Sequence, residues 1–140
     1  MNTTTNTAGA IINLTLHAAT EDQRQAGVQD LDVDLRPALL EVLDFKVLPD
    51  VEELESRAKR VIGLLADQLR GASALRGAMV MIGGMPAFMS PLQEALLSRG
   101  VIVGYAFSTR DCVEEPQSDG SVKKTYVFRH KGFTWVTAVS

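Results

Sequence analysis

The stretch that decides the fold is AMVMIGGMPAFMSPLQEALLSRGVIVGYAFSTRDCVEE, residues 78–115. It holds two short apolar runs, Ala78 to Ile82 and Val101 to Phe107. The first run meets Gly83-Gly84, and the second ends in Ser108-Thr109-Arg110. Apolar runs that are bounded by glycine and do not alternate with polar residues are typical of parallel strands buried on both faces.

The segment between the two runs has the signals of a helix. Ser90 is a suitable N-cap with Pro91 at the first helical position, and Gly100 is a natural stop. The stretch therefore predicts a strand, a helix and a second strand.

In open α/β sheets, ligands bind beyond the carboxyl ends of the strands. Gly83, Gly84 and the segment Ser108-Thr109-Arg110 are expected at that edge. Glycines let a ligand approach the backbone, and a helix N-terminus favours anions, so we expect an anionic ligand, with a phosphate ester as the leading candidate.

The chain before this stretch predicts two more strands and three helices. Strands are expected at Ala10–Leu16 and Val28–Leu31. Thr20 and Gln23 match a capping box, Pro37 opens a helix that reaches about Leu43, and Asp50 caps the longest helix, which runs to about Leu69.

After Glu115 the sequence predicts a β-hairpin around Asp119-Gly120. Cys112 to Glu115 is expected to pair with Val122 to Phe128, and Arg129 to Gly132 is expected to interrupt the following strand. The whole chain, residues 1–140, is predicted to be one α/β domain with a mostly parallel sheet, and residues 1–9 are expected to be a flexible segment.

Composition narrows the function classes. A net charge of −3 argues against binding of long nucleic acids, which needs a basic surface, but leaves room for a small nucleotide. The single cysteine fits the reducing cytoplasm, the N-terminus does not look like a signal peptide, and no apolar run is long enough to span a membrane. Two scattered histidines and one cysteine lack the spacing of a metal site, and no cofactor motif is present.

Each candidate site residue has a structural alternative. Gly83-Gly84 is either a phosphate cradle or a tight turn, and Ser108-Thr109-Arg110 either binds phosphate or includes a surface ion pair of Arg110 with Glu114 or Glu115. The cluster Arg129-His130-Lys131 is a solvated turn, unless the fold brings it to the same edge, where His130 would be an acid or base.

Two single residues are weighed in the same way. His17 follows the first strand near Thr15 and is either a ligand-binding or a structural residue. Cys112 is expected to be a buried thiol without a chemical role.

The order of strand, Gly83-Gly84, helix, Gly100-Val101 and strand resembles the small CARF-like proteins of type III CRISPR antiviral systems. Some of them are standalone ring nucleases that degrade cyclic oligoadenylate messengers. The opening, Asn13 to His17 followed by Thr20 to Gln23, is similar to their first strand and helix start. The segment Phe107 to Arg110, with Glu114 further on, is similar to the polar end of a later strand.

The resemblance implies a Rossmann-like homodimer that binds a cyclic oligoadenylate across its two-fold axis and cleaves it without metal. Arg110, Ser108 and His130 are then the catalytic candidates, with His17 as a second candidate acid or base. The ligand-binding candidates are Thr15, His17, Gly83, Gly84, Ser90, Thr109, Arg129 and Lys131.

Two alternatives to this enzyme stay open. The same fold is also compatible with a module that binds the cyclic nucleotide without cleaving it, and with a structural or interaction protein in which Gly83-Gly84 is only a turn.

Overall fold

The computed structural model describes residues 9–138, so most of the segment expected to be flexible, residues 1–9, lies outside the described residues. The strands are β1 (Ile11–Asn13), β2 (Val28–Asp30), β3 (Met79–Met81), β4 (Ile102–Pro116) and β5 (Val122–Val136). The α-helices are α2 (Glu21–Gln25), α3 (Arg36–Leu43), α4 (Val51–Gln68) and α5 (Pro86–Ser98), and a short 3-10 turn covers Ala72–Ala74.

The five strands form one sheet in the order β2-β1-β3-β4-β5. The first four are parallel, and β5 is antiparallel to β4. The predicted α/β class, with a mostly parallel sheet flanked by helices and a C-terminal hairpin, is therefore confirmed.

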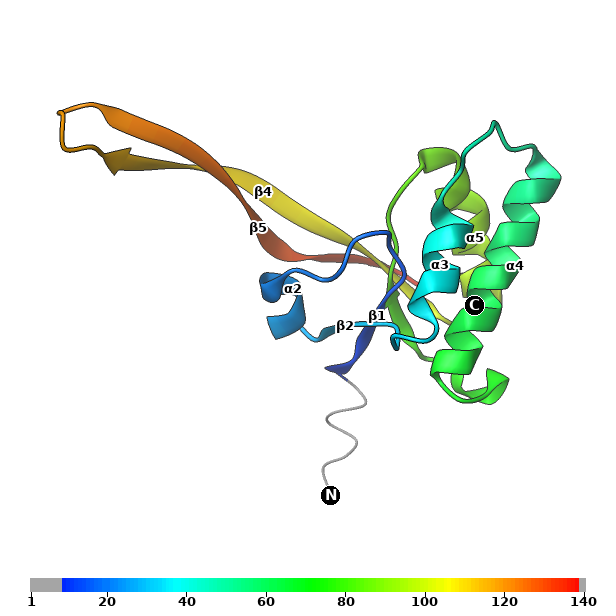
Figure 1. The fold of residues 1–140 in the computed structure, drawn as a ribbon. Coiled ribbons are helices and arrows are strands. Elements are labelled where there is room, and N and C mark those ends of the chain that lie inside the picture. Colours follow the sequence, from blue (N-terminus) through cyan, green and yellow to red (C-terminus); the bar gives the residue numbers. More distant parts are fainter. Residues whose placement is uncertain (1–8, 139–140) are drawn as a thin grey trace, which may run out of the picture.

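The hydrophobic core lies between one face of the sheet and the helices α3, α4 and α5, which gather on one side in Figure 1. Val80 of β3 and Val103 of β4 are fully buried, as are Leu14 just after β1, Leu65 of α4 and Leu92 of α5. Among the described residues, no helix combines the length and the apolarity needed to cross a membrane.

The other face of the sheet carries a smaller apolar cluster. Ile11, Val28 and Met81 of the strands are buried there with Ala19, and Phe133 of β5 packs against them. The short helix α2 lies on this side of the sheet (Figure 1).

Several local signals act as the sequence predicts. Thr20 and Gln23 form the capping box, with Thr20 Oγ1 accepting from the Gln23 amide at 3.1 Å and the Thr20 amide donating to Gln23 Oε1 at 3.0 Å. The side chain of Asp50 accepts from the Glu53 amide at the start of α4. Gly100 follows α5 with a φ of 80°, a conformation that favours glycine.

The predicted start of α5 is wrong. The helix begins at Pro86, after Met85, and Pro91 lies inside it. Pro86 is also a proline at a first helical position, and a second proline one turn later removes only one further backbone donor. Ser90 is therefore an exposed residue within the helix and not its N-cap.

Two further boundaries differ from the prediction. The first strand covers only Ile11–Asn13, because the chain bends after Asn13. The second apolar run does not end at Ser108-Thr109-Arg110, because β4 continues to Pro116 and pairs with β5 over its whole length beyond Val103. Arg129 to Lys131 likewise lies within β5 and forms no turn.

Residues 107–131, which we call the arm, extend from the body as a two-stranded ribbon (Figure 1). β3 pairs with β4 only as far as Gly104, so among the described residues the arm has no third strand. The ladder shifts between Phe107 and Ser108: Phe107 pairs with Gly132, Ser108 pairs with His130, and Lys131 is the extra residue of a β-bulge.

The ribbon joins the body where Trp135 lies across Gly104. A Cβ atom on Gly104 would stand 2.6 Å from Cζ3 of Trp135, closer than side chains approach one another. A side chain at position 104 would therefore displace the indole from the sheet.

We expect Gly104→Ala to lower the free energy of unfolding by about 1–3 kcal/mol, because it overpacks this junction. Urea denaturation measures the change. Gly63→Ala is the matched control: Gly63 is an exposed residue inside α4 with open space around its Cα, so alanine should raise stability by about 0.5–1 kcal/mol. An unchanged stability of Gly104→Ala would contradict the role of this contact.

Candidate functional site

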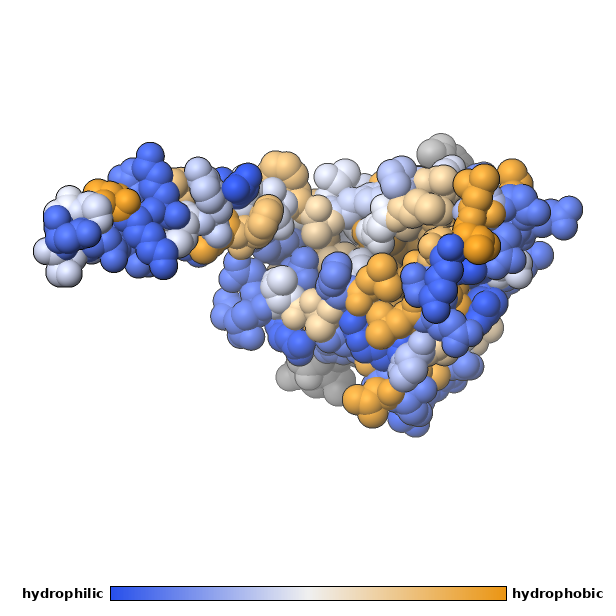
Figure 2. All heavy atoms as spheres, turned by 45° about the horizontal axis from the view of Figure 1, so that its top comes forward, coloured by the Kyte–Doolittle hydropathy of each residue, from blue (hydrophilic) through white to orange (hydrophobic). Residues whose placement is uncertain are grey.

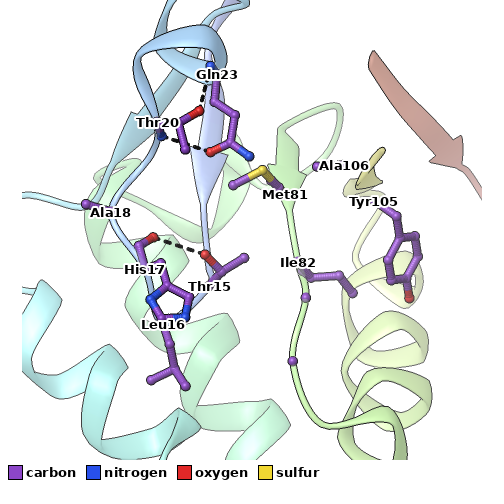
Figure 3. A pocket seen from close by; sticks show the side chains of 12 residues that line it. Thr15, Leu16, His17, Ala18, Thr20, Gln23, Met81, Ile82, Tyr105 and Ala106 are labelled. Carbon is purple, nitrogen blue, oxygen red and sulfur yellow. Dashed lines mark hydrogen bonds between the residues drawn. The ribbon is translucent and has the colours of Figure 1, made fainter. Parts of the chain in front are cut away.

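A pocket of about 540 Å³ lies at the carboxyl ends of β1 and β3, beside Tyr105 and Ala106 of β4. From β1 the chain continues to β2, toward one edge of the sheet, and from β3 it continues to β4, toward the other edge. The pocket therefore lies between β1 and β3, at the point where the strand order reverses. Figure 3 shows residues of α2 on one side of it and Tyr105 on another. Its lining residues are Thr15, Leu16, His17, Ala18, Thr20, Gln23, Met81, Ile82, Gly83, Gly84, Tyr105 and Ala106.

One wall of the pocket is the loop between β1 and α2, and Asn13 holds it in place. Asn13 is fully buried. Its Nδ2 donates to the His17 carbonyl and to Asp30 Oδ1, both at 2.8 Å, and its Oδ1 accepts from the Thr15 amide at 2.9 Å. The Thr15 hydroxyl lies 2.7 Å from the same oxygen and 3.1 Å from the His17 carbonyl. The amide of one buried side chain therefore sets the path of the loop.

Asp30, at the end of β2, is the second anchor. Its Oδ1 also accepts from the Ala19 amide at 2.9 Å, and its carboxylate faces Arg24 at 3.4 Å and Arg36 at 4.0 Å. Arg36 in turn donates to the Leu16 carbonyl at 3.1 Å. Residues of β2, α2 and α3 that do not line the pocket thus fix the wall that does.

These contacts set the charge of Asp30. Burial alone raises the pKa of this carboxyl, but the hydrogen bonds from Asn13 and the Ala19 amide and the charges of Arg36 and Arg24 outweigh burial. The pKa of Asp30 is therefore lower than its usual value of 3.8, and the carboxylate stays ionised.

The second wall is the loop Gly83-Gly84 between β3 and α5. Gly84 has a φ of 145°, which residues with a side chain rarely adopt, and a Cβ on Gly83 would lie 3.7 Å from Thr15 Cγ2. The loop between β1 and α2 and the loop Gly83-Gly84 therefore lie close together, and the second presents only glycine backbone to the first. Since α5 begins at Pro86, its N-terminal turn follows this loop directly, and such a turn favours negative charge.

The third wall comes from the start of the ribbon, at Tyr105 and Ala106. The Tyr105 hydroxyl donates to Gln93 Oε1 of α5 at 2.7 Å, and burial raises the pKa of this phenol. The neutral ring of Tyr105 therefore forms an aromatic wall of the pocket, held in place by this hydrogen bond.

The structure thus brings four predicted ligand-binding residues together: Thr15, His17, Gly83 and Gly84. The sequence prediction missed Thr20, Gln23 and Tyr105 as lining residues. Thr20 and Gln23 were recognised only as a helix cap, and an aromatic residue inside an apolar run carries no separate signal.

Three other predicted residues, Ser108, Arg110 and His130, share one face of the arm. Alternate residues of a strand point to the same side, and directly paired residues share a face. This face, which we call the aromatic face, carries Ser108, Arg110 and Cys112 from β4 and Tyr126, Phe128 and His130 from β5. Figure 2 shows hydrophobic residues between hydrophilic ones along the arm.

The aromatic face begins next to the pocket. Ala106 lines the pocket and pairs with Phe133, and the next pair outward on this face is Ser108 with His130. The His130 ring packs on Phe133 with the ring centres 4.7 Å apart. His130 Nδ1 is buried and has no hydrogen-bond partner within residues 9–138. The bulge at Lys131 places His130, and not Lys131, on the same side as Phe133.

Arg110 and Cys112 have surroundings that the sequence did not specify. The structural alternative for Arg110, an ion pair with Glu114 or Glu115, is absent from the described part of the chain, and the guanidinium of Arg110 lies 4.1 Å from the ring centre of Tyr126. Glu114 lies four residues along the same strand, beyond reach of Arg110. Cys112 is exposed, and the prediction of a buried thiol is wrong, because the arm has no core.

Thr109 and Arg129 lie on the opposite face. Both contact Asp111, Thr109 Oγ1 at 3.1 Å and Arg129 Nε at 3.5 Å. Together with Lys131 at the bulge and Ser90 in α5, they lie outside the pocket lining. Within residues 9–138, no group of three or more histidine, cysteine or acidic residues is placed to hold a metal ion.

The family of the chain follows from a match over residues 9–134 to a family model described as uncharacterized protein MJ1673 family. The chain belongs to the MJ1673 family. The matched range includes every pocket residue and the whole arm, so both features lie within the part that defines the family. Comparisons with curated proteins and with solved structures gave no match.

The Asp30 anchor makes a testable link between pH and stability. Because the pKa of Asp30 is lower in the folded state, its ionised form stabilises the protein above the unfolded pKa, and this contribution is lost as pH falls through the folded value. We expect Asp30→Asn to be less stable than the wild type at pH 7, and the difference to shrink as pH falls below 3.8.

Urea denaturation across this pH range measures the effect. The exposed carboxylate Asp34 is the control, since it forms no hydrogen bond or ion pair in the described part of the chain, and Asp34→Asn should follow the wild type at every pH. A difference between wild type and Asp30→Asn that does not vary with pH would show that the charge of Asp30 is not what anchors the loop.

Proposed function

We propose that the protein binds a cyclic oligoadenylate at the carboxyl-edge pocket and opens the ring without metal. The observation that carries the proposal is the continuity of two surfaces. The pocket of Thr15, His17 and Gly83-Gly84 passes through Ala106 to the aromatic face with Ser108 and His130. The resemblance to CARF-like ring nucleases supplies the identity of the ligand, and the proposed setting is antiviral signalling in the cytoplasm.

The pocket suits a nucleobase with its sugar. Its volume falls in the range of small-ligand sites, which is roughly 300–1,000 Å³. Met81, Ile82 and Tyr105 offer apolar and aromatic surface for the base. The Gly83-Gly84 loop and the α5 N-terminus offer backbone amides for the following phosphate.

The aromatic face suits the rest of the ring. Every base has a stackable face, and Phe128 and Tyr126 are 76% and 53% exposed. Arg110 stands beside them and can pair with phosphate oxygens through its planar fork. Aromatic and cationic side chains that alternate in this way are typical of sites for short single-stranded nucleic acids.

The proposed chemistry is attack by a ribose 2′-hydroxyl on the adjacent phosphorus. The 2′-oxygen bonds to phosphorus while its proton passes to His130, the bond from phosphorus to the 5′-oxygen breaks, and the departing 5′-oxygen takes up a proton from solvent water. The products are linear, with a 2′,3′-cyclic phosphate and a 5′-hydroxyl. The protein supplies alignment by the pocket and by Ser108, and charge stabilisation by Arg110.

A second candidate, binding without cleavage, has one observation in its favour. The pocket lining contains no carboxylate and no thiol, and its one imidazole, that of His17, is exposed to solvent. A protein with this lining could hold the ring as a sensor or sink.

The test incubates the purified protein with radiolabelled cyclic tri-, tetra- and hexa-adenylate in EDTA and follows binding and products together. We expect linear products with a cyclic phosphate. His130→Ala should lower the cleavage rate by roughly 10²–10⁴-fold while binding changes little, because a general base acts in the chemical step. Gly84→Val should weaken binding, because Gly84 needs its positive φ to shape the loop.

The controls separate the two candidates. Lys131→Ala removes a cation from the bulge, outside the pocket and the aromatic face, and should leave both readouts unchanged. Tight binding of an intact ring would favour the binding module. If the protein neither binds nor cleaves any ring, both candidates are refuted.

A further inference from the structure

The arm exposes surface that an isolated ribbon does not normally leave in water. Phe107, Val122, Tyr126 and Phe128 are each more than half exposed. A two-stranded hairpin is at best marginally stable alone, and it needs a third strand or a helix to pack against. Among the described residues, nothing covers the arm beyond its junction with the body.

The arm also has an open strand edge. From Tyr105 to Pro116, the side of β4 turned away from β5 has no strand beside it within residues 9–138, since β3 stops pairing at Gly104. Such an edge is a template for pairing with another strand.

We propose that this edge pairs antiparallel with the β4 edge of a second copy of the chain, centred on Cys112. The two ribbons then form a four-stranded sheet across the two-fold axis. This inference is independent of the ligand and goes beyond the proposed function.

Symmetry restricts the register. In an antiparallel pair, directly opposed residues lie on the same face of the sheet. The two-fold axis that relates the copies runs through the sheet and leaves each residue on its own face. The axis must therefore pass beside one residue, which lies opposite the same residue of the second copy. Centring on Arg110 or on Asp111 opposes like charges directly. Centring on Val113 opposes Asp111 to Glu115. Centring on a residue before Arg110 would place the hairpin turn of one copy against Ile102 to Gly104 of the other, where β3 already pairs.

Centring on Cys112 places Arg110 opposite Glu114 of the second copy, twice by symmetry, and opposes no like charges. No carboxylate lies within ion-pair distance of Arg110 inside residues 9–138, and over the same range Glu114 has no cationic partner at that distance. The charge pattern of the edge is therefore complementary to itself.

The same register carries a consequence for the pocket. Ser108 of one copy lies opposite Pro116 of the other, so the turn that follows Pro116 reaches the loop Gly83-Gly84 of the second copy. Each pocket would then be closed by the hairpin turn of the partner.

A charge reversal tests the register. Sedimentation equilibrium of the full chain should show a dimer, and Arg110→Glu and Glu114→Arg should each raise its dissociation constant roughly tenfold or more, because two pairs are lost and like charges meet. The double variant Arg110→Glu/Glu114→Arg should return to near the wild-type value. Circular dichroism of each variant checks that the body stays folded.

Cross-linking tests the centre. Directly opposed residues have Cα atoms about 4.5–5.5 Å apart, within the range of a disulfide. Oxidation with copper phenanthroline should therefore link Cys112 to Cys112 in a covalent dimer. The matched control, Cys112→Ser/Ser108→Cys, carries an equally exposed thiol that opposes Pro116 and should not cross-link. A monomeric wild type, a double variant no tighter than the single ones, or equal cross-linking of the control would each overturn the proposal.

Discussion

The site depends on the amide of one buried side chain, Asn13. It is the fully buried polar residue at the end of β1, and all of its hydrogen-bonding capacity is directed to the loop that follows and to Asp30. A buried amide without partners would cost about 1–3 kcal/mol for each unmet group, so the loop has little freedom to move away. Arg24 and Arg36 extend this network outward through Asp30. The pocket wall is thus held from behind, which leaves the side facing the cavity free for a ligand.

The fold follows from patterns that act over short distances. Thr20 with Gln23 and Asp50 begin helices by capping backbone groups a few residues away, and Gly100 follows the end of α5. Such local signals can be found in sequence. The carboxyl edge could be predicted for the same reason, because Gly83-Gly84 and Thr15 follow the strands directly. The start of α5 was missed because two prolines compete for it, and sequence alone does not say which one stands at the first turn.

The arm shows where sequence patterns fail. The residues Arg129 to Gly132 interrupt the apolar pattern and were interpreted as a break in the strand. Across them the aromatic residues change phase, from even positions at Tyr126 and Phe128 to odd positions at Phe133 and Trp135. In the structure the extra residue Lys131 absorbs the change, and one strand continues through it. A bulge is decided by pairing with β4, far along the chain, so it leaves no local signal. The grouping of Ser108 with His130 depends on this bulge and could not be derived from either segment alone.

Trp135 is the one tryptophan of the chain, and it stands where the arm leaves the body. Its ring packs on Phe133 at 5.1 Å between centres and covers Gly104, yet 37% of the residue remains exposed. The helical core therefore has no intrinsic fluorophore of this kind. Tryptophan emission from the native protein reports the attachment of the ribbon rather than the packing of the helices. An unfolding curve followed by fluorescence and one followed by the circular dichroism of the helices therefore observe two different parts of the molecule.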